Sequence, residues 1–142
     1  MSGIFGAVGT GREKARRLAD RHRKRWGDCE VESVDGCIVG GHARARGAVV
    51  RRRSSEWILI DGEHSAQARE IAGEWNPDGR SALLDEHGVP RRAASSAVVD
   101  REAKSVRLAA DWSGAFPIHW LQSGGIFAFS SSPAALVAVF GA

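Results

Sequence analysis

The start of the chain places a small hydroxyl side chain next to the chain terminus. Ser2 follows the initiator methionine, which is usually removed when the next side chain is as small as serine. Removal would leave the α-amine of Ser2 beside its own hydroxyl. Because a free α-amine titrates near neutral pH, it could act as general base for that hydroxyl. Ser2 is therefore a candidate nucleophile, and the alternative is that it simply precedes a first apolar strand.

Further segments carry polar residues at the ends of apolar runs. In chain order these segments are Met1-Ser2-Gly3-Ile4-Phe5-Gly6, Gly41-His42-Ala43-Arg44, Trp57-Ile58-Leu59-Ile60-Asp61-Gly62-Glu63, Ala110-Asp111-Trp112-Ser113-Gly114 and Gly125-Ile126-Phe127-Ala128-Phe129-Ser130-Ser131. Together they resemble the class II glutamine amidotransferase domain of asparagine synthetases, over nearly the whole chain. That family begins Met-Cys-Gly-Ile-Phe-Gly, so Ser2 stands where the family has its nucleophilic cysteine.

The resemblance implies a site made of five residues, and two of them, Ser2 and Asp61, depart from the family. Ser2 and Gly62 match the nucleophile and one donor of the oxyanion hole, whereas Asp61 stands where the family has asparagine. An ionised carboxylate accepts hydrogen bonds but donates none. Losing one oxyanion donor typically costs about 100- to 1,000-fold in rate. Arg44 matches the arginine that holds the substrate carboxylate, although a structural arginine at a strand edge explains it equally well, and Glu63 follows at the strand exit.

These departures favour a catalytically degenerate amidotransferase-like domain. The resemblance covers no synthetase half, and Ser123-Gly124-Gly125 lacks the Asp-Ser of a pyrophosphate loop, so we expect no ATP site and no cofactor. β-Lactam synthetases and lasso-peptide cyclases retain such a domain as a scaffold. We therefore expect a scaffold or partner subunit for an asparagine synthetase-like, adenylating, amide-forming protein or domain. The alternative is an N-terminal serine amidohydrolase that acts on glutamine or a small amide.

Composition indicates one globular domain spanning residues 1–142. The chain is 43% hydrophobic and 26% charged, which is ordinary for a globular protein. No apolar run reaches the roughly 20 residues of a membrane span, and no signal peptide precedes the first strand, so we expect a cytoplasmic protein. Cys29 and Cys37 have neither metal-ligand nor disulfide-framework spacing. We expect reduced thiols and no metal.

Basic residues form two clusters. They are Arg12, Lys14, Arg16, Arg17, Arg21, Arg23, Lys24 and Arg25 in the first cluster, and Arg51, Arg52 and Arg53 in the second. Such clusters occur in nucleic-acid-binding proteins. However, Ala15, Leu18, Ala19, His22 and Trp26 recur at helical spacing, so the first cluster reads as the outer faces of an amphipathic helix. We favour a solvated surface over a protein interface, and do not expect nucleic acid to be a partner.

The periodicity predicts separate blocks of strands and helices, which is typical of α+β folds with antiparallel sheets. Strands are expected near 3–8, 30–34, 36–42, 47–52, 56–61, 95–100, 104–110, 117–121 and 125–130, and helices near 12–25, 66–75 and from 133 onward. Ser132 and Pro133 are expected to begin the last helix as cap and first residue. The resemblance implies a reduced N-terminal nucleophile hydrolase-type αββα sandwich, with Ser2 near Asp61 and Gly62.

The chain has 5 tryptophans, which is many for its length. Trp57 lies on an apolar strand and is expected in the core. Trp112 and Trp120 lie near turns, where an indole can meet a partner. We expect the chain to form a homo-oligomer or to bind a partner through a patch that contains at least one of these two.

Overall fold

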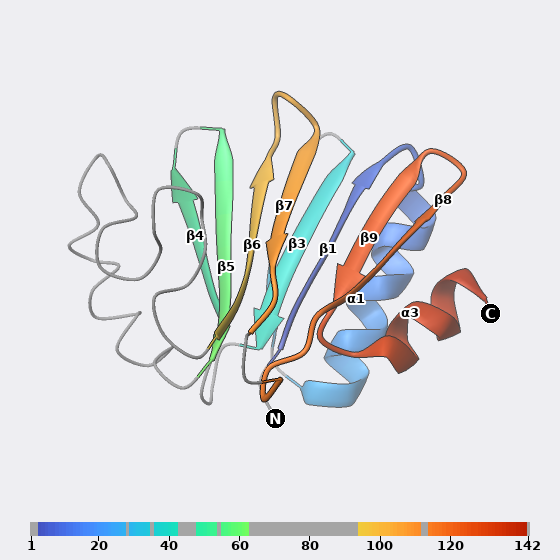
Figure 1. Ribbon diagram of the computed structural model, residues 1–142. Helices are drawn as coiled ribbons and strands as arrows, with labels where there is room; N and C mark the ends of the chain where they lie inside the picture. Colours follow the sequence, from blue (N-terminus) through green and yellow to red (C-terminus); the bar gives the residue numbers. More distant parts are fainter. Residues whose placement is uncertain are drawn as a thin grey trace.

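The computed structural model describes residues 3–27, 29–34, 36–42, 48–53, 55–62, 94–111 and 114–141 of the chain. Over these residues the protein is α+β: two antiparallel sheets lie face to face, and two helices cover one of them (Figure 1). The helices are α1 (Arg12–Trp26) and α3 (Pro133–Phe140). The helix expected at 66–75 lies outside the described residues.

The first sheet has five strands in the order β2-β3-β1-β9-β8, so the N-terminal strand is its central strand. Their bounds are β1 (Ile4–Gly9), β2 (Cys29–Val34), β3 (Cys37–His42), β8 (His119–Ser123) and β9 (Ile126–Ser130). The second sheet has four strands in the order β4-β5-β6-β7. Their bounds are β4 (Ala48–Arg53), β5 (Glu56–Gly62), β6 (Ala94–Asp100) and β7 (Ser105–Ala109).

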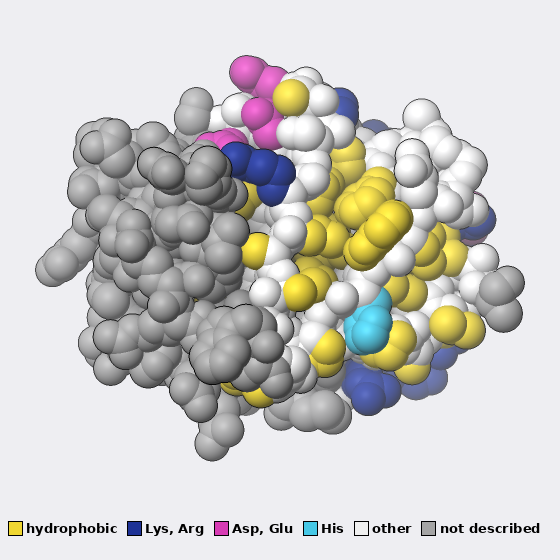
Figure 2. Space-filling view, viewed as in Figure 1, with side chains coloured by type: hydrophobic (Ala, Val, Ile, Leu, Met, Phe, Trp, Pro, Cys, Tyr) yellow, Lys and Arg dark blue, Asp and Glu magenta, His cyan; other side chains and the backbone are white. Residues whose placement is uncertain are grey.

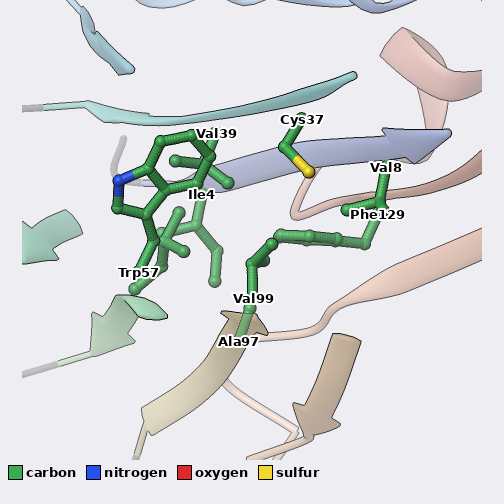
Figure 3. Close-up of a cluster of buried hydrophobic side chains, with 9 residues drawn as sticks. Ile4, Val8, Cys37, Val39, Trp57, Ala97, Val99 and Phe129 are labelled. Atoms are coloured by element: carbon green, nitrogen blue, oxygen red, sulfur yellow. The ribbon is translucent and has the colours of Figure 1, made fainter. Parts of the chain in front are cut away.

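Alternation along β1 divides the apolar side chains between two cores. Ile4 and Val8 point between the sheets, where they pack with Trp57 and Val99 of the second sheet and Phe129 of the first. Figure 3 shows these side chains directed toward one another from both sheets. The intervening positions of β1 point to the helices, as a strand with successive side chains on opposite faces requires. Trp57 is fully buried, as expected.

The second core joins the five-stranded sheet to α1 and α3. Phe5 and Ala7 of β1 pack there with Leu18 and Ala19 of α1 and Leu136 of α3. The predicted apolar face of α1 is confirmed by the burial of Leu18, Ala19 and His22 and by the partial burial of Ala15, whereas the side chain of Trp26 lies outside the description. Burial of this face, more than helix propensity, holds such a helix in place.

The start of α3 matches the cap that the sequence predicts. Ser132 has an extended conformation, its Oγ accepts a hydrogen bond from the Ala135 N–H (3.3 Å), and Pro133 occupies the first turn. A serine at this position satisfies one of the backbone N–H groups that a helix start leaves unpaired. The expected boundary of this helix is therefore confirmed.

The outer face of the four-stranded sheet is also buried. Ile58, Ile60 and Val98 point away from the sandwich core, yet at most 5% of each is exposed. The contacts of α1 and α3 lie with strands of the five-stranded sheet instead. The described residues therefore form three layers: the two helices, the five-stranded sheet and the four-stranded sheet.

The strand boundaries follow the sequence pattern closely, and the largest shift occurs at β8. This strand was expected at 117–121 and spans His119–Ser123 instead. Pro117 has no backbone N–H to contribute to a ladder, so pairing begins after it. Gly124 and Gly125 form the turn that joins β8 to β9: φ is 48° at Gly124 and 79° at Gly125, which suits a two-residue turn between twisted strands.

Candidate functional site

Three chain segments meet where β1 begins, β5 ends and β9 ends. Ser131, directly after β9, connects them. Its Oγ accepts a hydrogen bond from the Ile4 N–H (2.9 Å), and its own N–H donates to the Ile4 carbonyl (2.9 Å). The Oγ atom also lies 3.2 Å from Oδ2 of Asp61, to which it donates. One hydroxyl therefore links the start of the N-terminal strand to a carboxylate of the opposite sheet.

Asp61 is buried at the end of an otherwise apolar strand. It follows Trp57 and Leu59 on the face of β5 that points between the sheets, and only 3% of it is exposed. A buried carboxylate is tolerated only where hydrogen bonds replace its hydration. Ser131, which also contacts Ile4 at the start of β1, supplies one such hydrogen bond.

The ends of β3 and β5, which belong to segments that resemble the family, also lie near the start of β1. Ile4 pairs with Gly41, so the end of β3 lies beside the start of β1. Gly62 is the last residue of β5 and pairs with Ala94 at the start of β6. The structure thus brings Asp61 and Gly62 to the N-terminal end of β1. Ser2, Arg44 and Glu63 lie outside the described residues, as do Trp75 and Trp112.

Sequence reasoning gave Ser131 no role, although it lies in a matched segment. Its position follows from the strand pairing. β9 runs antiparallel to β1, and its last residue, Ser130, lies opposite Phe5 of β1 on one side and His119 of β8 on the other. The residue after Ser130 must therefore reach the first residue of β1. This signal is non-local, because the hydrogen-bonded partners are 127 residues apart in sequence.

A second serine, Ser130, pairs with a histidine on the other face of the sheet. Its Oγ lies 2.8 Å from Nε2 of His22, and the imidazole stacks on Phe5 with ring centroids 4.3 Å apart. Burial, and secondarily the charge of Arg25, lowers the pKa of His22 to about 3. A ring that is so hard to protonate is a poor general base near neutral pH. Because Ser130 and His22 are both fully buried, this pair is structural.

Asp111 and Gly114, the outer residues of the matched Asp-x-x-Gly segment, are joined by a hydrogen bond from the Gly114 N–H to the Asp111 carbonyl (3.2 Å). Oδ2 of Asp111 accepts hydrogen bonds from the N–H groups of Ala115 (2.9 Å) and Phe116 (3.2 Å). Ser95 donates through its hydroxyl to the Phe116 carbonyl and accepts from the Asp111 N–H. Gly114 has φ of 76°, a conformation that glycine adopts without steric cost. These contacts give Asp111 and Gly114 a structural role in the loop between β7 and β8.

A separate groove runs between α1 and strands β2 and β3. It has a volume of about 550 Å³, and Arg12, Arg16 and Arg23 line it above Val31 and Ile38. Gly9 and Gly36, at the far end of β1 from Ile4, also line it. The groove therefore belongs to the helix-covered face and does not include the Asp61–Ser131 contact.

Within the described ranges, no cluster of His, Cys, Asp and Glu has the geometry to hold a metal ion, and neither Cys29 nor Cys37 forms a disulfide. No helix among the described residues is long and apolar enough to cross a membrane. No family model matches this chain, and no curated protein sequence matches it. The functional assignment therefore depends on the residues and contacts given above.

Proposed function

We propose that this chain is a catalytically degenerate glutamine amidotransferase-like domain that acts as a scaffold or partner subunit for an ATP-dependent, amide-forming synthetase. In this proposal its fold is a reduced N-terminal nucleophile hydrolase-type αββα sandwich. The buried outer face of β5 and β6, which α1 and α3 do not cover, is consistent with a further layer on that side.

The contacts at the start of β1 support this proposal. An N-terminal nucleophile must lie at the end of a central strand, with its oxyanion donors on a neighbouring strand end. Here β1 is the central strand of its sheet, and Asp61 of the opposite sheet is connected to Ile4 through Ser131. The start of the first strand and the end of β5, two segments that the resemblance assigns to one site, thus lie close together.

One observation carries the degenerate reading: the group at the oxyanion position is a buried carboxylate. Asp61 accepts a hydrogen bond from Ser131. A tetrahedral intermediate needs donors aimed at its oxyanion, and a carboxylate there repels the developing charge. Ser2 is also a weaker nucleophile at neutral pH than the cysteine of the family, because thiols are a few per cent ionised. The two changes weaken the same step of the reaction.

A glutaminase assay tests this reading. We expect wild-type protein to release no more ammonia from glutamine than Ser2→Ala does. The double variant Ser2→Cys/Asp61→Asn returns both the thiol and the amide donor, and we expect it to exceed either single variant. Thermal unfolding of each variant serves as the folding control. Ammonia release by the wild type that depends on Ser2 would instead establish the amidohydrolase.

The scaffold role has its own test. The probe is an asparagine synthetase-like protein, encoded in the same genome, that lacks an N-terminal amidotransferase domain. We expect it to co-purify with the wild-type chain, and we expect Ser2→Ala to leave that association unchanged, since the proposed role needs no nucleophile. Failure of every such protein to associate would contradict the scaffold proposal.

A further inference from the structure

The last part of the chain is free of charge. All 20 Lys and Arg and all 17 Asp and Glu lie within residues 1–111, and residues 112–142 contain none. This stretch forms β8, β9 and α3, which are neighbours in the fold. Figure 2 shows apolar side chains gathered over β8 and β9, with Lys and Arg side chains bordering this region from below. β8 and β9 themselves therefore contribute none of the charges that keep protein surfaces apart.

Among the described residues, the two large hydrophobic side chains that are exposed both belong to this stretch. Trp120 of β8 is 62% exposed and stacks on Phe127 with ring centroids 5.7 Å apart. Val137 of α3 is 54% exposed. Because Trp120 pairs opposite Phe129, its indole is on the inter-sheet face, whereas α3 packs on the other face of the sheet. The exposed indole of Trp120 thus places apolar surface at the edge strand β8.

β8 also differs from the other edge strands. The edges of the two described sheets are β2, β8, β4 and β7. β2 contains Glu30 and Glu32, β4 contains Arg51 to Arg53, and β7 contains Arg107, whereas β8 reads His-Trp-Leu-Gln-Ser. Charged residues on an edge strand discourage pairing with another chain, and their absence leaves the unpaired N–H and C=O groups of the edge available.

We propose that two copies of the chain pair antiparallel through β8, about a two-fold axis, and so join their five-stranded sheets into one continuous sheet. An antiparallel edge is self-complementary, because the two-fold axis places the donors of each strand opposite the acceptors of the other. β8 presents no like charges to its own copy, unlike β2, β4 or β7. The pairing buries both Trp120 side chains near the axis, where aromatic cross-strand neighbours add stability. It does not depend on the proposed scaffold function.

Sedimentation velocity over a range of concentrations tests the pairing. The wild type is expected to be a dimer at high concentration. Trp120→Lys and Gln122→Lys place a charge on the edge, and each is expected to raise the dimer dissociation constant at least about tenfold. Ser105→Lys, an exposed position on the edge strand β7, is the matched control and is expected to leave it unchanged. Urea unfolding shows that each variant folds.

Hydrogen exchange identifies the contact as strand pairing. Backbone amides of β8 are expected to gain protection as wild-type concentration rises, while those of β2 do not. A chain that stays monomeric at all concentrations would overturn the proposal. So would a dimer that Ser105→Lys weakens as much as Trp120→Lys, or one in which β8 amides gain no protection, because either result places the contact elsewhere.

Discussion

Asp61 and Ser131 show how one polar contact can fix the relation between two sheets. The carboxylate is 3% exposed, and the serine hydroxyl that reaches it also accepts the Ile4 N–H. In a low-dielectric interior such bonds are stronger than in water, but a missing partner is also more costly. The same serine therefore fixes the start of β1 and stabilises the buried side chain of Asp61. At position 61 the family that the chain resembles has an asparagine amide.

Removing the Ser131 hydroxyl should be costly for its size. Ser131→Ala leaves the Ile4 N–H without this acceptor and Asp61 without this donor, so we expect a loss of about 1–3 kcal/mol in the free energy of unfolding. Urea denaturation measures it, and Ser123→Ala in the exposed β8–β9 hairpin is the control, expected to cost far less. A double-mutant cycle with Asp61→Ala, which leaves no side-chain acceptor for the Ser131 hydroxyl, should show coupling between the two side chains. Additive effects would contradict a direct interaction.

His22 makes stability depend on pH. Its pKa is lowered by burial to about 3 from 6.5, so the unfolded chain takes up a proton first as the pH falls. The folded state therefore loses stability as pH falls below about 6.5, and the loss ends near pH 3. Between pH 7 and pH 5 it amounts to about 2 kcal/mol.

Urea titrations at several pH values measure this effect. His22→Gln retains a side chain that can hydrogen-bond Ser130 but does not titrate, so we expect it to remove most of the pH dependence in this range. The same pH dependence in wild type and variant would show that another group is responsible.

At the scale of elements, the glycine in the middle of β1 leaves room for an aromatic ring of the neighbouring strand β9. Gly6 pairs with Phe129, and a Cβ at Gly6 would lie 2.5 Å from two carbons of the Phe129 ring. We expect Gly6→Ala to lower the free energy of unfolding by about 1–3 kcal/mol through overpacking. Adding Phe129→Leu should make the alanine less costly than it is in the wild-type background. Urea unfolding of the wild type, the two single variants and the double variant measures these free energies. If Gly6→Ala costs as much stability in the Phe129→Leu background as in the wild type, the Phe129 ring is not the cause.

Elements with a strong local signal could be predicted from the sequence. The signal for these elements lies within a few neighbouring residues. Examples are the apolar run of β1, the amphipathic spacing of α1, the Gly124-Gly125 turn and the Ser132 cap. The order of strands in each sheet could not be predicted in this way, because it depends on pairings between distant segments. Ser131 shows the limit most clearly: its partners Ile4 and Asp61 are far from it in sequence.

The candidate site was therefore predictable only in part. Asp61 could be singled out because the resemblance places an asparagine at that position. That Asp61 would be buried, and held by a serine of the opposite sheet, required the three-dimensional contact. Likewise, the sequence alone placed His22 on the apolar face of α1 but gave no indication of its bond to Ser130.

At the scale of the whole molecule, charge is divided between neighbouring parts of the surface. α1 contains eight basic and two acidic residues, whereas α3, which packs beside it, contains none of either. Arg12 and Arg16 line the groove beside β2, and within the described part of the chain neither makes an ion pair. Only Arg23, paired with Asp20 at 3.2 Å, is partly neutralised there. An electropositive helix face thus adjoins the uncharged helix α3.

Such a face should attract nucleic acid only through its charge. We expect DNA binding in a gel shift at about 50 mM salt, with an affinity that falls at least about a hundredfold by about 200 mM, because binding releases counterions. Arg12→Glu/Arg16→Glu should weaken this low-salt binding equally for unrelated sequences, since exposed arginines here contact phosphate and not bases. The matched control Arg107→Glu, on β7, should have little effect. Tight, sequence-dependent binding that persists at the higher salt would instead make this chain a nucleic-acid-binding protein.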